Sequence, residues 1–304
     1  MINIISSCTS SKKYSPSNLL ELTNIDDHLL LEDACDLWIN NININESTQY
    51  KASQLYKGAA WKVTLDIKEI LDKKTPTNLY VASAGYGLIH SDKKIYSYDC
   101  TFSPGDSNSI SKFNNYLDSP SNILWWDRIN TFSSDSFPID SYFFIVLPHD
   151  YLVASQNFIQ EIIYKHNKKV FIFVANKKSP PSFMDKNIIK FDSRFNSFQT
   201  GVMINILQRA VFWLSNEIVM KNIPLCHKDL QNHIDMKLAQ YKAFTMPVRK
   251  QLSEKEICEK IRLMILYNNI SSATQGLKYF RQLGFACEQK RFGKLFKEIK
   301  CELG

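Results

Sequence analysis

Hydrophobic positions follow two kinds of pattern in the first two thirds of the chain. Short apolar runs, bounded by turns and without polar alternation, lie at residues 2–7, 79–84, 142–148 and 169–175. Such runs are typical of strands that are buried on both faces of a sheet. Apolar residues at three- to five-residue steps predict helices over residues 27–39, 48–72, 150–166 and 201–221. This order predicts an α/β fold with a central, mostly parallel sheet flanked by helices.

The pattern changes after Pro224, where strand-like runs end. Helical spacing then predicts helices over residues 226–243, 253–268, 272–283 and 288–300. We therefore expect two domains, an α/β catalytic domain over 1–223 and an all-helical DNA-binding domain over 224–304.

The last two of these helices combine an apolar face with a basic flank. Ser271 or Ser272 is expected to cap the first helix and Gly284 to end it. The inward residues are Leu277, Phe280 and Leu283 in the first helix and Phe292, Leu295, Phe296 and Ile299 in the second. The cations beside them are Lys278, Arg281, Lys290, Arg291, Lys294 and Lys297. This pattern predicts a helix-turn-helix-like module; a charged hairpin that braces the α/β domain is the alternative.

Charge is concentrated in the same region. The 304-residue chain has a net charge of +7, and residues 250–304 contribute +5 from eleven Lys and Arg against six Glu. The preceding residues therefore carry only +2, so the tail is the part suited to a polyanion such as DNA.

Composition narrows the class of protein further. The seven cysteines are scattered without a C-x-x-C pair, which predicts reduced thiols rather than disulfides or a zinc site. No stretch of eighteen apolar residues occurs, and the first residues do not form a signal-peptide pattern. We expect a cytoplasmic protein that needs no membrane, metal or cofactor.

Ligands of parallel α/β sheets bind beyond the carboxyl ends of the strands, so the loops there are the candidate sites. The first loop contains Ser10, Lys12 and Lys13, which suit a phosphate, although it lacks the glycines of a P-loop. A solvated loop with ordinary surface lysines is the alternative.

Two further loops follow the strand at 79–84. Gly85 and Gly87 flank Tyr86, an arrangement that lets the backbone approach a ligand, or simply makes a tight turn. Asp99 lies between aromatic residues, where a carboxylate is costly unless it is paired or used in catalysis. The alternative for Asp99 is a cap on the polar segment 103–109.

Additional residues belong to the expected helices. Tyr56 and Trp61 are core residues or stacking partners. His149 is a pocket acid or a surface imidazole, and Asp150 is expected to cap the following helix.

Four segments in combination resemble a known family. They are residues 8–13 (CTSSKK), 56–61 (YKGAAW), 83–89 (SAGYGLI) and 98–102 (YDCTF). Together they are similar to the phage-defence DNA glycosylases, bacterial proteins distantly related to the YaaA family and to nucleobase-exchanging or nucleobase-excising domains. Residues 274–292 resemble a C-terminal helical module of the same group. The resemblance covers about residues 1–215 and 270–300.

The family removes glucosylated hydroxymethylcytosine from phage genomes and leaves abasic sites. The resemblance therefore implies a DNA N-glycosylase whose partner is modified double-stranded phage DNA. We assign Asp99 as the catalytic carboxylate, Tyr86 as the residue that stacks on the flipped base or reads its edge, and Ser10, Lys12 and Lys13 as phosphate ligands. The base or its attached sugar would be contacted by Ser83, Thr101 and His149, and the pocket completed by Tyr56, Trp61, Gly85, Gly87 and Phe102.

Three other functions compete with this hypothesis. A ligand-sensing DNA-binding regulator would use the same two domains without chemistry. A base-exchanging transglycosylase would replace the base. A nuclease ranks last, because the sequence has no convincing cluster of acidic residues for two-metal cleavage.

Overall fold

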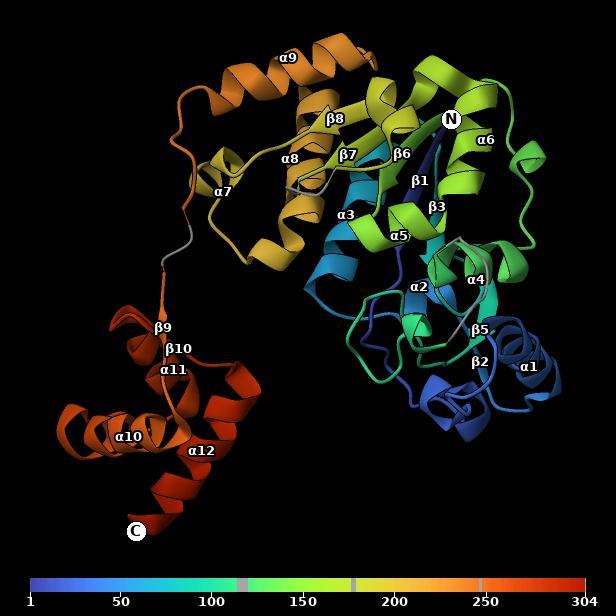
Figure 1. The fold of residues 1–304 in the computed structure, drawn as a ribbon. Helices are drawn as coiled ribbons and strands as arrows, with labels where there is room; N and C mark the ends of the chain where they lie inside the picture. Colours follow the sequence, from blue (N-terminus) through green and yellow to red (C-terminus); the bar gives the residue numbers. More distant parts are fainter. Residues whose placement is uncertain (114–119, 176–178, 246–247, 304) are drawn as a thin grey trace. The chain divides into compact units, whose positions relative to one another are not determined.

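The computed structural model describes residues 1–113, 120–175, 179–245 and 248–303 and divides the chain into two compact units (Figure 1). Unit 1 spans Met1–Phe244 and unit 2 spans Thr245–Gly304. Unit 1 is an α/β unit, and unit 2 is built mainly from helices. The predicted fold class is therefore confirmed.

A six-stranded sheet forms the centre of unit 1. In spatial order its strands are β4 (Gly87–His90), β3 (Thr77–Ser83), β1 (Ile2–Ser7), β6 (Tyr142–Val146), β7 (Val170–Val174) and β8 (Ile188–Lys190). β4 is antiparallel to β3, and the other neighbouring pairs are parallel. The four apolar runs are confirmed as β1, β3, β6 and β7. The hydrophobic pattern did not predict the short strands β4 and β8.

The register explains why these strands lack polar alternation. Ile4 lies opposite Leu79 of β3 on one side and opposite Phe144 of β6 on the other, and all three side chains are fully buried. From β1 the chain runs to β3 on one side and later returns to β6 on the other. The order therefore reverses between β1 and β6, and the loops that follow these strands are the expected ligand position.

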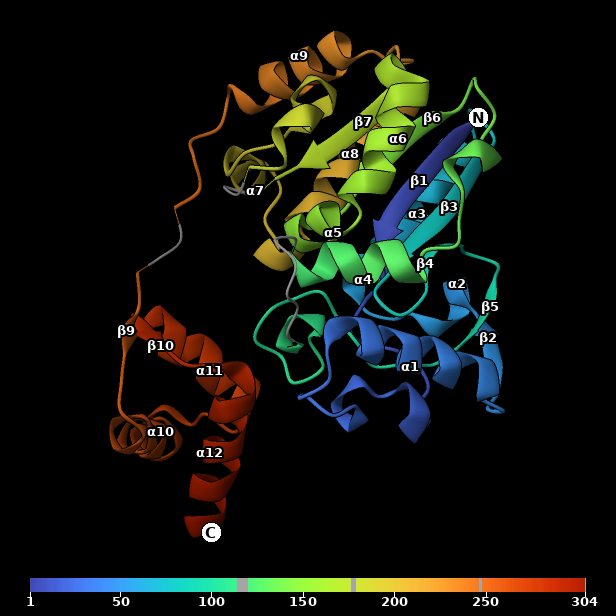
Figure 2. The same cartoon turned by 45° about the vertical axis from the view of Figure 1, so that its right-hand side comes forward.

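Helices cover both faces of the sheet. α3 (Ala59–Asp72) and α8 (Ile206–Met220) pack together on one face, whereas α4 (Ser121–Ile129) and α6 (Gln156–His166) pack on the other (Figures 1 and 2). The short helix α5 (His149–Ala154) follows β6 and contacts α4. The predicted helix over 150–166 is thus two helices, α5 and α6, which meet at Ser155.

A small substructure is formed by segments from both sides of α3 in the chain. It contains α1 (Leu31–Ile44), β2 (Gln49–Lys51), α2 (Ala52–Leu55) and β5 (Lys94–Tyr96). The predicted continuous helix over 48–72 is wrong for two reasons. Tyr50 pairs with Ile95 in the antiparallel β2–β5 ladder, and Gly58 has a φ of +105°, which ends any helix that precedes α3.

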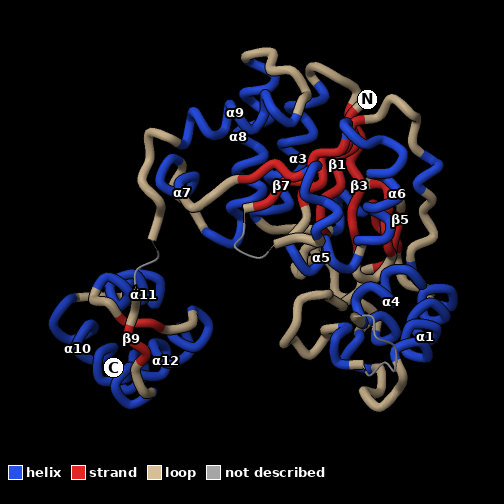
Figure 3. Tube along the Cα trace, turned by 45° about the horizontal axis from the view of Figure 1, so that its top comes forward, coloured by secondary structure: helices blue, strands red, loops and turns tan. Residues whose placement is uncertain are grey.

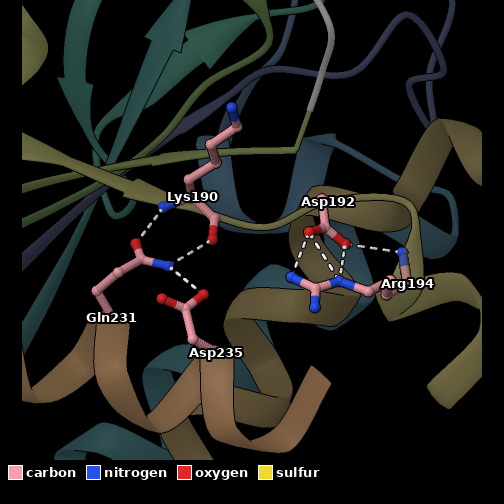
Figure 4. A network of polar contacts seen from close by, with 5 residues as sticks. All are labelled: Lys190, Asp192, Arg194, Gln231 and Asp235. Carbon is pink, nitrogen blue, oxygen red and sulfur yellow. Dashed lines mark hydrogen bonds and ion pairs between the residues drawn. The ribbon is translucent and has the colours of Figure 1, made fainter. Parts of the chain in front are cut away.

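The edge strand β8 is covered by α9 (His227–Leu238), as Figure 4 shows. The Gln231 side chain accepts a hydrogen bond from the Lys190 N–H at 2.8 Å and donates to the Lys190 carbonyl at 3.1 Å. It also donates to Asp235. Beyond the strand, Asp192 accepts a forked pair of hydrogen bonds from Arg194. The amide of Gln231 therefore takes the place that a further strand would occupy.

The domain boundary lies later than predicted. Residues 224–244 belong to unit 1, because α9 buries Leu230, Ile234 and Leu238 in the core of the α/β unit. Helix α7 (Arg194–Phe198) contacts α9 as well. Helical pattern alone assigned this segment to the tail, but packing places it with the sheet.

Unit 2 contains α10 (Glu254–Asn268), α11 (Ala273–Gln282) and α12 (Gln289–Glu302), drawn in blue in Figure 3. Two short strands, β9 (Lys250–Gln251) and β10 (Phe285–Ala286), pair in parallel, which the helical pattern did not predict. The predicted inward residues Leu277, Phe280, Phe292, Leu295, Phe296 and Ile299 are buried in its core.

The ends of α11 agree with the predicted caps, but one residue that was predicted to face inward does not. The Ser272 hydroxyl accepts a hydrogen bond from the Gln275 N–H, and Gly284 has a φ of +84°. Leu283 was expected to face inward but is 47% exposed, since the helix ends at Gln282 and Leu283 lies past its last turn.

Shorter 3-10 helices are found at Asn18–Leu20, Leu22–Asn24, Ile110–Lys112, Ser134–Ser136, Asn167–Lys169, Ser182–Asn187 and Met203–Asn205. Among the residues that the structure describes, no helix combines the length and apolar character that crossing a membrane requires.

Candidate functional site

Tyr98 joins two of the predicted motifs at the carboxyl end of the sheet. Its side chain is fully buried, and its phenol oxygen lies 2.7 Å from the Ser83 hydroxyl and 3.0 Å from the Tyr56 phenol. Ser83 is the last residue of β3, and Tyr56 follows α2. The hydroxyl chain Ser83–Tyr98–Tyr56 therefore ties together segments that are distant in the sequence.

Gly85 makes room for this tyrosine. A Cβ atom at Gly85 would lie 2.7 Å from the Tyr98 ring, closer than side chains tolerate. The turn is also held by the indole N–H groups of Trp38 and Trp125, which donate to the carbonyls of Gly85 and Ala84. The close approach that the sequence predicted at Gly85 is thus made to a protein ring.

Packing against neighbouring residues also explains why position 87 is a glycine. Its φ is +67°, and a Cβ atom there would lie 2.6 Å from the Asn130 Cα. The Asn130 side chain accepts a hydrogen bond from the Leu88 N–H at 2.9 Å. Gly87 consequently starts β4 against Asn130, the residue that caps the C-terminus of α4, and makes the tight turn that was the alternative to ligand contact.

The phenol groups in and around Tyr98 are electrically neutral. Burial raises the pKa values of Tyr56 and Tyr98 well above their usual range, so both phenols keep their protons. Burial likewise raises the pKa of Tyr151, whose phenol lies 3.1 Å from the Cys8 thiol. Tyr151 belongs to α5 and Cys8 follows β1, so the cluster extends across the point where the strand order reverses.

One cation lies over this neutral cluster. The Lys12 ammonium is 4.1 Å from the centre of the Tyr98 ring, a cation–π contact. The loop that carries it is hydrogen-bonded to the segment after α2, because the Lys13 N–H donates to Leu55 and the Lys57 N–H donates to Ser11. These backbone hydrogen bonds therefore fix the position of Lys12. The side chains of Ser10 and Lys13, in the same loop, are exposed.

Asp99 is held more firmly than a surface aspartate. Its N–H donates to the Leu20 carbonyl at 2.7 Å, and its carbonyl accepts from the Leu22 N–H at 2.9 Å. Its partly exposed carboxylate accepts a hydrogen bond from the Asn108 side chain at 2.5 Å. The Thr101 hydroxyl accepts a hydrogen bond from the Ser103 N–H at the start of the polar segment 103–109. Asn108 belongs to the same segment, so the Asp99 carboxylate also helps to hold it, as the structural alternative expected.

Tyr86 completes the accessible part of the site. Its ring is partly exposed and meets the Tyr98 ring edge-on, with the centroids 5.3 Å apart. Its hydroxyl donates to the Tyr96 carbonyl at 3.4 Å. Lys12 and Tyr86 therefore both touch Tyr98, and Asp99 is its neighbour in the chain.

Trp61 and Phe102 were expected in the pocket, but they are core residues. Trp61 is 3% exposed and donates to the Ser53 carbonyl, while Phe102 is fully buried against Trp126 and Tyr151. Ser83, Tyr56 and Thr101 are also buried. These residues shape and support the site rather than face a ligand.

His149 lies on the β7 side of the reversal point. It lines a small hollow together with Leu147, Val174 and Leu207, and its Nδ1 is buried without a hydrogen-bond partner among the described residues. A larger hollow of about 870 Å³ lies beyond the ends of β7 and β8, lined by apolar side chains and by Lys190 and Asp192.

Asp150 was predicted to cap α5, and the structure corrects this. Pro148 occupies the N-cap position, and Asp150 lies within the first turn. The helix starts one residue earlier than the pattern suggested.

The predicted DNA-binding cations of unit 2 differ in their contacts. Lys278, Lys290 and Lys294 have exposed side chains. Arg281 donates to the Cys287 carbonyl, and Arg291 forms an ion pair with Glu254 at 3.0 Å.

Three contributors to the site were missed as individual residues. Tyr98 is the centre of the cluster and was present in the YDCTF motif, Tyr151 follows the run that became β6, and Asn108 lies nine residues beyond Asp99. Position after a predicted parallel strand was the available signal for Tyr151, because such positions meet at one edge of the sheet.

Comparison of the chain with models of known protein families finds no match, and comparison with curated proteins finds none. Any function of the chain is therefore inferred from the geometry of the site and from the motifs.

Proposed function

We propose that the protein is a DNA N-glycosylase that hydrolyses the N-glycosidic bond of a modified cytosine, glucosylated hydroxymethylcytosine, in phage DNA. The observation that carries this proposal is the fixed carboxylate of Asp99. Its backbone is hydrogen-bonded on both sides, and its carboxylate has a neutral amide partner and remains partly exposed. A charge held this way is preorganised for a reaction that develops the opposite charge.

Cleavage of an N-glycosidic bond creates positive charge on the sugar. In the proposed reaction the bond between the anomeric carbon and the base breaks, and a bond from that carbon to a water oxygen forms. One proton of the water passes to the departing base, so an abasic site and a free base result. Asp99 stabilises the oxocarbenium-like sugar and orients the water, by analogy with glycoside hydrolysis.

A base inside a duplex is out of reach of such a group, so the nucleotide must be flipped out. Tyr86 supplies a partly exposed aromatic ring for stacking. Lys12 supplies a positive charge for the adjacent phosphate, and its ammonium is held over the ring of Tyr98, the residue that precedes Asp99. The phenols behind these residues stay neutral and do not compete with the DNA for the cation.

The proposed partner is double-stranded DNA in the cytoplasm. All seven cysteines are free thiols, which suits a reducing compartment. The concentration of positive charge in residues 250–304 supports a polyanionic partner.

The test uses purified protein, phage DNA with glucosylated hydroxymethylcytosine, and the same DNA unmodified. Mass spectrometry of the products is expected to detect free modified base and an equal amount of abasic sites with the modified DNA only. An exchanged base would identify a transglycosylase, and cut phosphodiesters would identify a nuclease.

A second candidate is a ligand-sensing DNA-binding regulator. The 870 Å³ hollow beyond β7 and β8 favours it, since a cavity of this size with an apolar lining and a few charges is typical of small-molecule sites. Tight binding to one DNA sequence with no change in the DNA would support the regulator and exclude the glycosylase.

A further inference from the structure

Unit 2 has a groove between α11 and α12. It consists of two adjoining hollows of about 770 and 620 Å³, and both are lined by Ala273, Gln289 and Gly293. A helix-turn-helix module uses a protruding helix to enter DNA, whereas this surface is concave. The groove is therefore a different kind of binding surface from the one that the sequence predicts.

Cations line the groove on both sides. One side has Arg249, Lys278 and Arg281, and the α12 side has Lys290, Lys294 and Lys297. The spacing of the three α12 lysines places them on one face of the helix.

These charges are available to a ligand. Lys278, Lys290 and Lys297 form no ion pair within 4.0 Å with described residues, and Lys294 has only a 3.9 Å surface contact with Glu298. The acidic residue in the groove, Glu288, already accepts hydrogen bonds from the first N–H groups of α12.

Gly293 marks where a ligand would come closest. A Cβ atom at Gly293 would meet no atom within 4 Å, so packing does not require a glycine there. Glycine inside a helix costs about 1 kcal/mol relative to alanine. Gly276 of α11 is different, because a Cβ there would lie 3.0 Å from the Phe296 ring. Packing thus explains why residue 276 is a glycine. It does not explain the glycine at 293, and we attribute that glycine to the groove.

Arg291 lies outside this surface. It lines a neighbouring hollow of about 480 Å³ that shares Arg249 and Arg281 with the groove, and its ion pair with Glu254 partly neutralises its charge. Among these basic residues of α12, the three lysines therefore face the groove and Arg291 does not.

We propose that this groove binds one phosphodiester strand of duplex DNA independently of base sequence, with the strand passing over Gly293. The proposal rests on the proposed function for its choice of DNA as the polyanion. Lysine and arginine around an open groove contact phosphates, and such contacts carry no base information.

The experiment measures binding of the full chain to unmodified duplexes of several sequences by fluorescence anisotropy at a series of salt concentrations. The triple variant Lys290→Ala, Lys294→Ala, Lys297→Ala should bind all duplexes more weakly. The slope of log affinity against log salt should become shallower by about 3, at about 0.9 per lost phosphate contact. The matched control replaces Lys228, Lys242 and Lys255, which are exposed and do not line the groove.

Gly293→Leu tests the same groove without changing charge. It should weaken binding while circular dichroism shows an unchanged helix content, and Arg291→Ala should have little effect. Equal losses in the two triple variants, an unaffected Gly293→Leu, or stronger binding to duplex RNA than to DNA would overturn the proposal.

Base release from modified DNA is measured separately. Groove-dependent DNA binding without base release would leave this proposal standing and contradict the glycosylase. Base release together with DNA binding that does not depend on the groove would support the glycosylase and contradict the groove proposal.

Discussion

The two units of the molecule handle charge in opposite ways. In unit 1, Lys12 lies over a buried cluster of protonated phenols, Asp99 follows Tyr98 of that cluster in the chain, and each is held by specific contacts. In unit 2, cations are spread along an open groove and most have no ionic partner among the described residues. The first arrangement suits chemistry at one atom, and the second suits attraction to an extended polyanion.

The difference also concerns rigidity. A site that acts on one bond needs its groups fixed to within a fraction of an ångström. The tryptophan N–H bonds to the carbonyls of Ala84 and Gly85 provide that support in unit 1. Phosphate contacts tolerate looser side chains, because the attraction between exposed charges depends weakly on geometry and strongly on salt.

The largest effect on stability is expected from Tyr98→Ala. Removing a fully buried ring should cost about 3–5 kcal/mol of the free energy of unfolding of unit 1. All five tryptophans lie in unit 1, so their fluorescence during denaturant unfolding reports on this unit alone. Tyr98→Phe keeps the ring and should cost only about 1–2 kcal/mol, from the hydroxyl bonds to Ser83 and Tyr56. Equal costs for both variants would mean that the ring does not anchor the cluster.

Two glycine-to-alanine substitutions should have opposite signs. Gly85→Ala forces a methyl group against the Tyr98 ring and should destabilise unit 1 by about 1–3 kcal/mol. Gly293→Ala meets open space in a helix and should stabilise unit 2 by up to about 1 kcal/mol. Hydrogen exchange resolves the two units separately. Destabilisation by Gly293→Ala would show that packing, and not the groove, requires this glycine.

A smaller effect is expected from acid. Burial lowers the pKa values of His166 and His227 below their usual 6.5, so folding favours the neutral rings. Their contribution to stability is complete above pH 6.5 and is lost as the pH falls below it toward the folded-state pKa values. Unit 2 contains no histidine. Between pH 7 and 5.5 unit 1 should therefore lose stability and unit 2 should not.

The double variant His166→Gln, His227→Gln is the control for this pH dependence, and it should flatten the response of unit 1. An equal loss of stability in unit 2 over this pH range would contradict the assignment to histidine.

Local pattern predicted the parts of the fold that depend on neighbouring residues. The β1, β6 and β7 runs and the three helices of unit 2 are recognisable because burial on both faces, or on one stripe, shapes composition directly. The β2–β5 ladder was missed because Tyr50 and Ile95 pair across forty-five positions of chain, and helical spacing around Tyr50 suggested otherwise. Gln231 shows the same limit, since its hydrogen bond to β8 joins residues forty-one positions apart.

The site was predictable as a set of residues but not as an arrangement. The motifs contain Asp99, Tyr86 and Lys12, yet nothing local indicates that Gly85 exists to admit the Tyr98 ring. Trp61 was misassigned because an aromatic residue near polar neighbours looks the same whether it faces the core or a ligand.

Single-turnover base release from modified duplex DNA tests the central claim most directly. Asp99→Asn keeps the size of the side chain and should slow release by about 10³-fold while duplex affinity is unchanged. Asp106→Asn changes an exposed aspartate of the same loop and should release base at the wild-type rate. Equal rates for Asp99→Asn and the wild-type protein would contradict the account.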